Sequence, residues 1–203
     1  MCMLFSDEYT EPAGNGESSL RERGSKFLGY VFPVHTETAL KQYLQQIKQQ
    51  YPDATHHCYA VVMHPDQSYQ RSTDDGEPSN TAGRPILRAI LSAGLTNVLV
   101  IVVRYYGGTQ LGIPGLIKAY GDAAQLALQH AGRAPKFMED ELLLATDFEH
   151  EQDIYRLTEK LGGKIVQRDY SNDIKIVLRI RRSEILKCKK MLSDFPRISL
   201  LKG

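Results

Sequence analysis

The glycine-rich segment 107–115 is the part of this sequence whose residue types point most directly to chemistry. It joins an apolar run at 98–103 to a predicted helix. A strand that opens through glycines into a helix start exposes backbone N–H groups and the positive end of the helix dipole, which together attract anions. P-loop spacing is present, but Ile113 stands where the lysine should be. We therefore predict either an anion-binding loop or a tight turn that lets the helix pack closely on the sheet.

The anion-binding hypothesis includes cationic side chains on both sides of the loop, because guanidinium and ammonium groups neutralise phosphate charge. The predicted anion-binding residues are Arg84, Arg104, Tyr106, Gly107, Gly108, Gly112, Gly115 and Lys118.

Three carboxylates within four residues, at Asp74, Asp75 and Glu77, form a second candidate site. Such a cluster can hold a magnesium ion or supply a general acid and base. Acidic residues are also common in turns and at helix N-termini, where the dipole favours negative charge. In an enzymatic alternative, Asp75, Glu77 and Lys118 are the catalytic candidates and magnesium is the cofactor. Otherwise we expect no cofactor. The enzymatic interpretation requires that this segment and the glycine loop meet in space.

The run His56-His57-Cys58 has the residue types of a metal site but not the geometry. On a strand, His56 and Cys58 point to one face and His57 to the other, so the three cannot converge on one ion. We therefore expect no metal. The other cysteines are Cys2 and Cys188, and three scattered cysteines are typical of free thiols. Cys58 is either a buried thiol or a nucleophile activated by a neighbouring histidine.

Charge is balanced overall, with 25 Lys and Arg against 24 Asp and Glu, but it is unevenly distributed. Residues 136–153 hold 1 basic and 7 acidic side chains, whereas residues 154–203 hold 13 basic and 5 acidic ones. A basic face of this kind attracts phosphodiester backbones. A solvated charged face is an equally good explanation. The predicted nucleic-acid-binding residues are Lys175, Arg179, Arg181, Lys187 and Lys190.

Hydrophobic periodicity divides the chain into two domains behind a polar N-terminal segment. Residues 6–19 have almost no aliphatic side chains, so this segment is either a mobile tail or a loosely docked edge, and we predict a mobile tail over residues 1–19. Residues 20–134 are predicted to pack helices against a sheet. The predicted elements are strand 27–34, helix 36–51, strands 57–63 and 68–72, a helix from Ser79 or Thr81 to Gly94, strand 98–103 and helix 114–131.

The second predicted domain covers residues 138–203 and has the order β-α-β-β-α-(β), which is the ferredoxin-like plait. Its predicted strands are 141–146, 164–170, 174–181 and 198–201, and its predicted helices are 150–161 and 183–194. The predicted fold class is therefore α+β. No apolar run approaches the roughly 18 residues that a membrane helix needs, and no signal peptide is recognisable. We expect a cytoplasmic protein with no membrane partner.

Three blocks of the first domain form a specific signature. They are His56-His57-Cys58-Tyr59-Ala60, Asp74-Asp75-Gly76-Glu77-Pro78 with Thr81-Ala82-Gly83, and Val103-Arg104-Tyr105-Tyr106-Gly107-Gly108. Their order and spacing closely resemble the Impact/YigZ family. The resemblance implies, for the first domain, an α/β fold shared with the second domain of a small-subunit ribosomal protein and with GHMP kinases. It also implies a second domain similar to a C-terminal domain of elongation factor G.

The resemblance further implies a role near translation, because eukaryotic members regulate a kinase that responds to amino-acid starvation by binding its activator. We do not carry that kinase role over to this chain. The resulting hypothesis is a regulatory, non-enzymatic binding protein. Its first domain would hold a phosphate-bearing ligand or partner, and its basic second domain would bind RNA or the ribosome. The alternatives are a pure protein-interaction module and a phosphotransferase or hydrolase.

Overall fold

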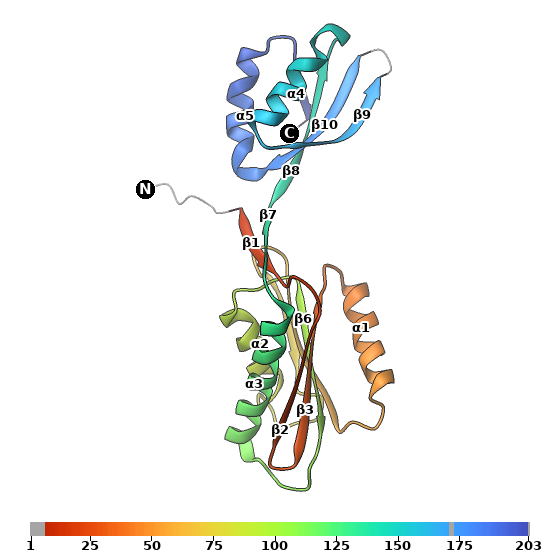
Figure 1. Cartoon of the computed structure of the whole chain (residues 1–203), viewed down its shortest axis with the longest axis vertical. Helices are drawn as coiled ribbons and strands as arrows, with labels where there is room; N and C mark the ends of the chain where they lie inside the picture. The colour runs from red at the N-terminus through yellow and green to blue at the C-terminus, as the bar shows by residue number, and fades with distance from the viewer. Residues whose placement is uncertain (1–6, 171–172, 203) are drawn as a thin grey trace, which may run out of the picture. The chain divides into compact units, whose positions relative to one another are not determined.

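The chain forms two compact units in the computed structural model, which describes residues 7–170 and 173–202. The first unit comprises residues 9–136, and the second comprises residues 137–203 together with the short segment before Tyr9 (Figure 1). The α+β class expected from the sequence is confirmed. No helix in the described residues is long and apolar enough to cross a bilayer.

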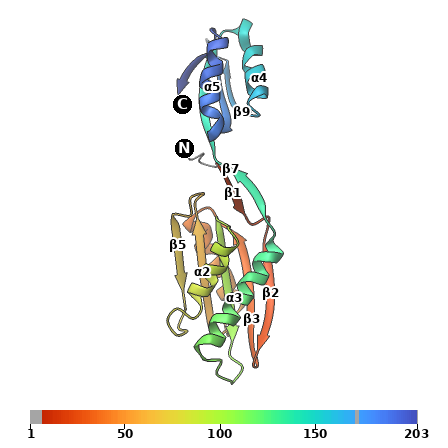
Figure 2. The same ribbon diagram turned by 90° about the vertical axis from the view of Figure 1, so that its left-hand side faces the viewer.

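The first unit is built on a five-stranded sheet in which all neighbouring strands are antiparallel. In spatial order the strands are β2 (Gly16–Glu22), β3 (Ser25–Pro33), β6 (Val98–Tyr105), β4 (His56–Met63) and β5 (Tyr69–Thr73). Helix α1 (Glu37–Gln50) covers one face, and α2 (Gly83–Ser92) and α3 (Gly112–Ala131) lie together on the other (Figures 1 and 2). The sheet is therefore the middle layer of three.

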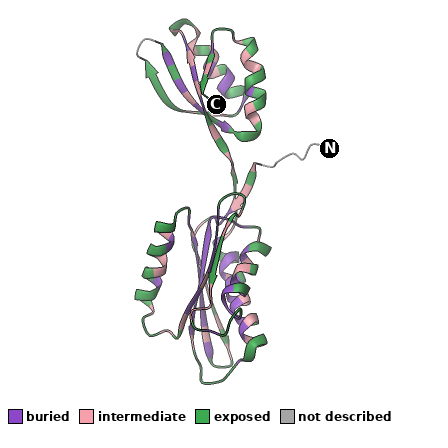
Figure 3. Ribbon diagram, turned by 180° about the vertical axis from the view of Figure 1, so that it is seen from behind, coloured by how far each residue is buried: buried purple, intermediate pink, exposed green. Residues whose placement is uncertain are grey.

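Strand β6 is the centre of this sheet, and its six consecutive apolar residues are all buried (Figure 3). Side chains alternate across a strand, so Val98, Val100 and Val102 join the core under α2 and α3. Their neighbours, among them Leu99 and Ile101, join the core under α1. This confirms the prediction of a central strand covered on both faces.

The two helix starts predicted from capping residues have different outcomes. Thr36 caps α1 as predicted, with its hydroxyl accepting from the Ala39 N–H at 3.2 Å. Neither Ser79 nor Thr81 caps α2, and that part of the prediction is wrong. The first N–H groups of α2 instead donate to the carboxylate of Asp74, which reaches the helix from across the preceding loop.

The described part of the predicted mobile tail is ordered as strands. Strand β1 (Glu8–Glu11) pairs with β7 (Ala134–Phe137), and β2 forms an edge of the five-stranded sheet. Strand β2 lies very close to α3: a Cβ added at Gly16 would stand only 2.2 Å from the main-chain oxygen of Ala127, so the approach requires glycine. The Ser18 hydroxyl donates to the Ala123 oxygen at 2.7 Å. An edge strand tolerates such polar residues because its outer side faces solvent.

The second unit has a four-stranded antiparallel sheet in the order β11-β8-β10-β9. This is the strand order of the predicted plait, with apolar side chains of its two helices and its inner strand face forming one core. Short 3₁₀ turns cover residues 148–150, 182–184 and 192–194. The elements are β8 (Glu139–Thr146), α4 (Glu151–Lys160), β9 (Lys164–Tyr170), β10 (Ile174–Arg181), α5 (Ile185–Met191) and β11 (Ser199–Lys202).

Candidate functional site

The carboxylate segment of the first unit is joined by a buried ion pair to the end of β6, the strand that leads into the glycine loop. The Nη1 atom of Arg104, at the end of β6, lies 2.5 Å from Oε1 of Glu77. Only 5 % of Arg104 and 9 % of Glu77 is exposed. The two motifs that the sequence left unplaced are therefore linked through Arg104, not by a direct contact.

Glu77 is the centre of a wider polar network. The Tyr120 hydroxyl, from α3, donates to the same Oε1 atom at 2.7 Å, and Nε2 of His56 lies 3.7 Å from it. The Tyr120 ring packs edge-on against Phe27 of β3, with ring centroids 5.1 Å apart. One carboxylate thus connects two strands, the segment before α2, and α3.

Arg104 connects this network to the glycine loop. Its Nη2 donates to the Ser25 hydroxyl at 3.3 Å, and the Gly107 N–H donates to the same oxygen at 3.2 Å. The guanidinium lies over the rings of both Phe27 and Tyr106, 5.5 Å from each centroid. Its Nε atom is buried without a partner among the described residues. Arg104 thus faces Glu77 and the underside of the loop, not solvent.

The other two carboxylates of the cluster hold backbone. Asp74 accepts from the N–H groups of Asn80, Ala82 and Gly83 at 2.8 to 2.9 Å. Burial acts to raise the pKa of Asp74, but these three donors outweigh it and the net pKa is lowered. Asp75 accepts from the His57 N–H at 2.7 Å. The described residues contain no group of three or more His, Cys, Asp or Glu side chains placed to hold a metal.

The loop from Tyr106 to Gln110 is exposed, but its start is firmly held. The Tyr106 N–H donates to the Thr55 hydroxyl at 3.1 Å. A Cβ on Gly107 would lie 2.0 Å from the carbonyl carbon of Gly24, so only glycine fits there. The tight-turn interpretation of the loop therefore accounts for Gly107. Two large apolar side chains are exposed here: Tyr106 at the start of the loop, 48 % exposed, and Ile113 in the first turn of α3, 59 % exposed.

The predicted anion-binding residues do not converge on one point. Lys118 and Gly115 line a small pocket of about 390 Å³ together with Arg23 and Glu22. In that pocket the Nζ of Lys118 pairs with Asp122 at 2.5 Å. The remaining members lie elsewhere: Arg104 is buried, Arg84 is exposed on α2, Gly108 is exposed in the loop and Gly112 begins α3, both glycines with positive φ.

The histidines and cysteines behave as parts of the core. His57 points to the α1 face, its Nε2 lies 3.0 Å from the Tyr51 oxygen, and burial lowers its pKa. The Cys58 thiol is buried and donates to the main-chain carbonyl oxygen of Asp74 at 3.0 Å. Burial raises the pKa of this thiol. A neutral thiol is a weak nucleophile, so this geometry matches the buried-thiol interpretation. Cys188 is also a buried free thiol, while Cys2 lies outside the described residues.

The basic residues of β10 are exposed, as predicted, but the acidic strand β8 lies beside them. Arg179 pairs with Glu141 at 2.7 Å, and Arg181 stands opposite Glu139 and over the Phe137 ring. Part of the positive charge of β10 is thus paired across the sheet, and the unit as a whole is nearly balanced, because residues 137–203 hold 13 basic and 12 acidic side chains. On and beside α5, Lys187 pairs with Glu184 at 2.8 Å, while Lys190 is exposed.

Two residues that hold the loop, Ser25 and Thr55, were not among the predicted site residues. Their roles depend on contacts with residues 82 and 51 positions away, respectively. A lone serine or threonine carries no local pattern that would reveal such a contact.

The network lies within the part of the chain that matches a known family. The Impact N-terminal domain family matches residues 23–128, a span that contains every residue from Ser25 to Tyr120 described above. The chain belongs to the Impact family. The Impact member YigZ of Escherichia coli is 34 % identical over 178 residues, which are 87 % of each chain.

The Impact relationship extends to eukaryotes and to a solved structure. The protein IMPACT homolog of Saccharomyces cerevisiae is 32 % identical over 134 residues, covering 63 % of this chain and 51 % of its own length. A solved structure described as a hypothetical protein is 30 % identical, covers 98 % of both chains, and superposes with a TM-score of 0.71.

Proposed function

We propose that this Impact-family protein regulates translation by binding a partner through the loop from Tyr106 to Ile113. The observation that carries the proposal is the buried Glu77–Arg104 pair, which fixes the base of that loop from beneath. The translation role rests on membership of the Impact family. A cytoplasmic place of action is part of the same proposal.

A loop of this construction suits binding. The backbone at its start is held by Ser25 and Thr55, so little conformational entropy would be lost there when a partner binds. It presents one aromatic and one aliphatic side chain, Tyr106 and Ile113, both about half exposed or more. Exposed apolar side chains on a rigid loop are typical contacts in protein interfaces.

The same contacts support binding over phosphoryl transfer. A catalytic carboxylate needs free oxygen atoms for magnesium or for a proton. One oxygen of Glu77 instead accepts from both Arg104 and Tyr120, and one oxygen of Asp75 accepts from the His57 N–H. Lys118, the cationic candidate, is paired with Asp122.

The partner can be tested by sedimentation of the full chain with ribosomal particles. We expect Tyr106→Ala combined with Ile113→Ser to weaken co-sedimentation about tenfold. Leu186→Ser, on an exposed apolar residue of α5, is the matched control and should bind as the parent does. Equal binding by the loop variant and the control would remove the loop from the proposal.

Affinity for RNA is a separate element of the proposal and has its own variant. Lys175, Arg179 and Arg181 replaced together by alanine should weaken RNA binding and lower the slope of log affinity against log salt by about 2. An unchanged slope would remove the plait from RNA binding. For the enzymatic alternative, thermal stabilisation by ATP or GTP with magnesium is the decisive observation, and we expect none.

A further inference from the structure

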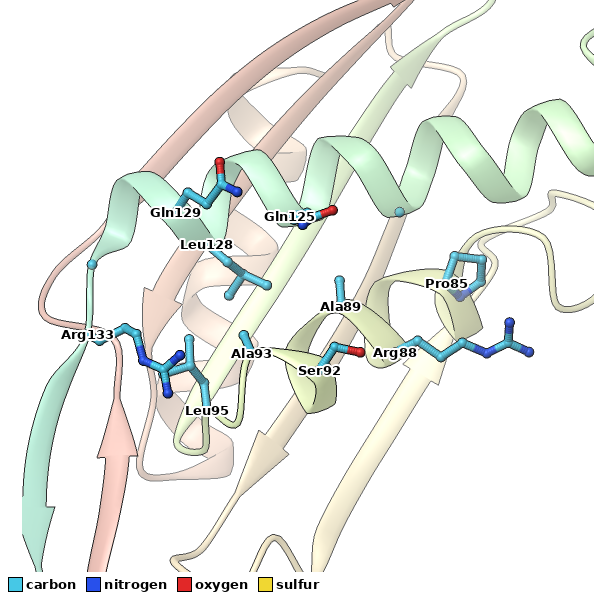
Figure 4. Close-up of a pocket in the computed structure, with 12 residues that line it drawn as sticks. Pro85, Arg88, Ala89, Ser92, Ala93, Leu95, Gln125, Leu128, Gln129 and Arg133 are labelled. Carbon is cyan, nitrogen blue, oxygen red and sulfur yellow. The ribbon is translucent and has the colours of Figure 1, made fainter.

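A groove between α2 and α3 of the first unit shares no residue with the loop site. It encloses about 830 Å³, within the range of roughly 300–1,000 Å³ that small-molecule sites occupy (Figure 4). Its lining is apolar at the base and polar at the rim. The lining residues are Pro85, Arg88, Ala89, Ser92, Ala93, Leu95, Gly121, Gln125, Leu128, Gln129, Gly132 and Arg133.

The base of the groove comes from small and buried apolar residues. Leu95 and Leu128 are 1 % and 4 % exposed, and the alanines Ala89 and Ala93 on α2 are half-buried. Alanine at these two positions leaves open the space that a larger side chain would fill. Gln125 and Gln129 stand along the α3 side (Figure 4). The combination is an apolar bed edged by neutral hydrogen-bonding groups.

The charges of the groove are all of one sign. Arg88 and Arg133 line it, and no aspartate or glutamate does. Neither guanidinium has an ion pair or a hydrogen bond in the described part of the chain. By contrast, the guanidinium groups of Arg179 and Arg182 in the second unit are paired with carboxylates. Arg133 and Leu95 both line one end of the groove, where Nη2 of Arg133 would lie 3.7 Å from a Cβ at Gly94, the residue before Leu95 (Figure 4).

A purely structural role for Arg133 would be to offset the negative end of the α3 dipole. That role uses only its charge and leaves its N–H donors unused. A guanidinium fork beside an apolar bed is the geometry that recognises a carboxylate attached to an apolar body.

We propose that this groove binds small amphipathic carboxylates. The apolar body of the ligand lies on Ala89, Ala93 and Leu128, and its carboxylate pairs with Arg133, with the Gln129 amide nearby. The inference is independent of the proposed function, because none of these residues contacts the loop from Tyr106 to Ile113.

The test uses 1-anilinonaphthalene-8-sulfonate, an amphipathic anion whose fluorescence rises in apolar surroundings. It is titrated against the full chain and displaced with decanoate, or with decyltrimethylammonium, which carries a similar chain and the opposite charge. We expect saturable binding to one site, displacement by decanoate, and little displacement by the cation. Equal displacement by both, or absence of binding, would overturn the proposal. The second result would favour a protein segment as occupant.

Three variants locate the site. Arg133→Ala should weaken decanoate about tenfold, and Ala89→Leu, which fills the groove, should abolish binding. Arg71→Ala, at an exposed arginine of β5 outside the groove, is the matched control. Circular dichroism melting verifies that each variant is folded. If either groove variant bound the probe and decanoate as tightly as the Arg71→Ala control does, the ligand would bind outside the groove and the proposal would be overturned.

Discussion

Replacing Glu77 tests whether the buried ion pair stabilises the first unit and its loop. Glu77→Gln leaves Arg104 charged, 5 % exposed and without a carboxylate. Breaking one side of a buried pair in this way costs about 3–5 kcal/mol. The glutamine oxygen still accepts from Tyr120, so that hydrogen bond is kept. Glu77→Ala also leaves the buried Tyr120 hydroxyl without its acceptor, which adds about 1–3 kcal/mol to the loss of unfolding free energy. We therefore expect the alanine variant to be the less stable of the two.

The assay combines urea unfolding, followed by circular dichroism, with hydrogen–deuterium exchange read peptide by peptide. Local exchange is needed because the chain has two compact units and a single unfolding curve would mix them. We expect amide protection to fall in β4 and β6, which flank the ion pair. Peptides of β8 and β10, in the second unit, should keep theirs.

Two further variants test whether the loss of stability comes from the unpaired buried charge of Arg104. Lys118→Ala removes an exposed ion pair on α3 and should leave unfolding unchanged. Glu77→Gln with Arg104→Met removes both charges and should be less destabilised than Glu77→Gln alone, because no cation remains stranded. The reasoning is refuted if Glu77→Gln costs less than about 1 kcal/mol or leaves exchange in β6 unchanged.

Three further predictions concern the loop, the thiol and the buried histidine. Gly107→Ala places a Cβ 2.0 Å from the Gly24 carbonyl carbon and should cost about 3 kcal/mol in urea unfolding. Gly108→Ala, at φ +82° in open space, should cost only about 1 kcal/mol, and equal costs would contradict this. Burial raises the Cys58 pKa, so N-ethylmaleimide should modify Cys58 only in urea, and mass spectrometry of the native protein would expose any earlier labelling. Burial lowers the His57 pKa below its ordinary 6.5, so the unfolded chain binds more protons and stability should fall as pH drops below about 6.5. His57→Gln should flatten that dependence of stability on pH, and an unchanged slope would show that His57 does not cause it.

Local pattern was sufficient for most of the elements. Six consecutive apolar residues at 98–103 predicted the central strand, and Thr36 predicted the start of α1. The start of α2 could not be read locally, because the carboxylate that accepts from the Ala82 N–H is that of Asp74, eight positions earlier. The order of strands and helices also sufficed to predict the plait of the second unit.

Features that depend on how strands pair were less predictable. The acidic and basic segments of the second unit are distant in sequence, yet register places Glu141 beside Arg179 and pairs part of the positive charge expected on that face. The sequence likewise suggested Arg104 as an anion ligand. Its side chain is buried because α3 brings Tyr120, and with it Glu77, over that end of the sheet. The edge strand in the predicted tail depends on the close approach of Gly16 to α3.

The network beneath the loop also sets when the loop can acquire its shape. Ser25 and Arg104 are 79 residues apart, and Glu77 and Tyr120 are 43 apart. Contacts of such long separation form late and slow folding. During synthesis at about 5–20 residues per second, Tyr120 follows Ser25 by roughly 5–20 s. Most of the support of the glycine loop, including Ser25 and Glu77, is thus synthesised before the loop, but the network is complete only once Tyr120 of α3 has followed.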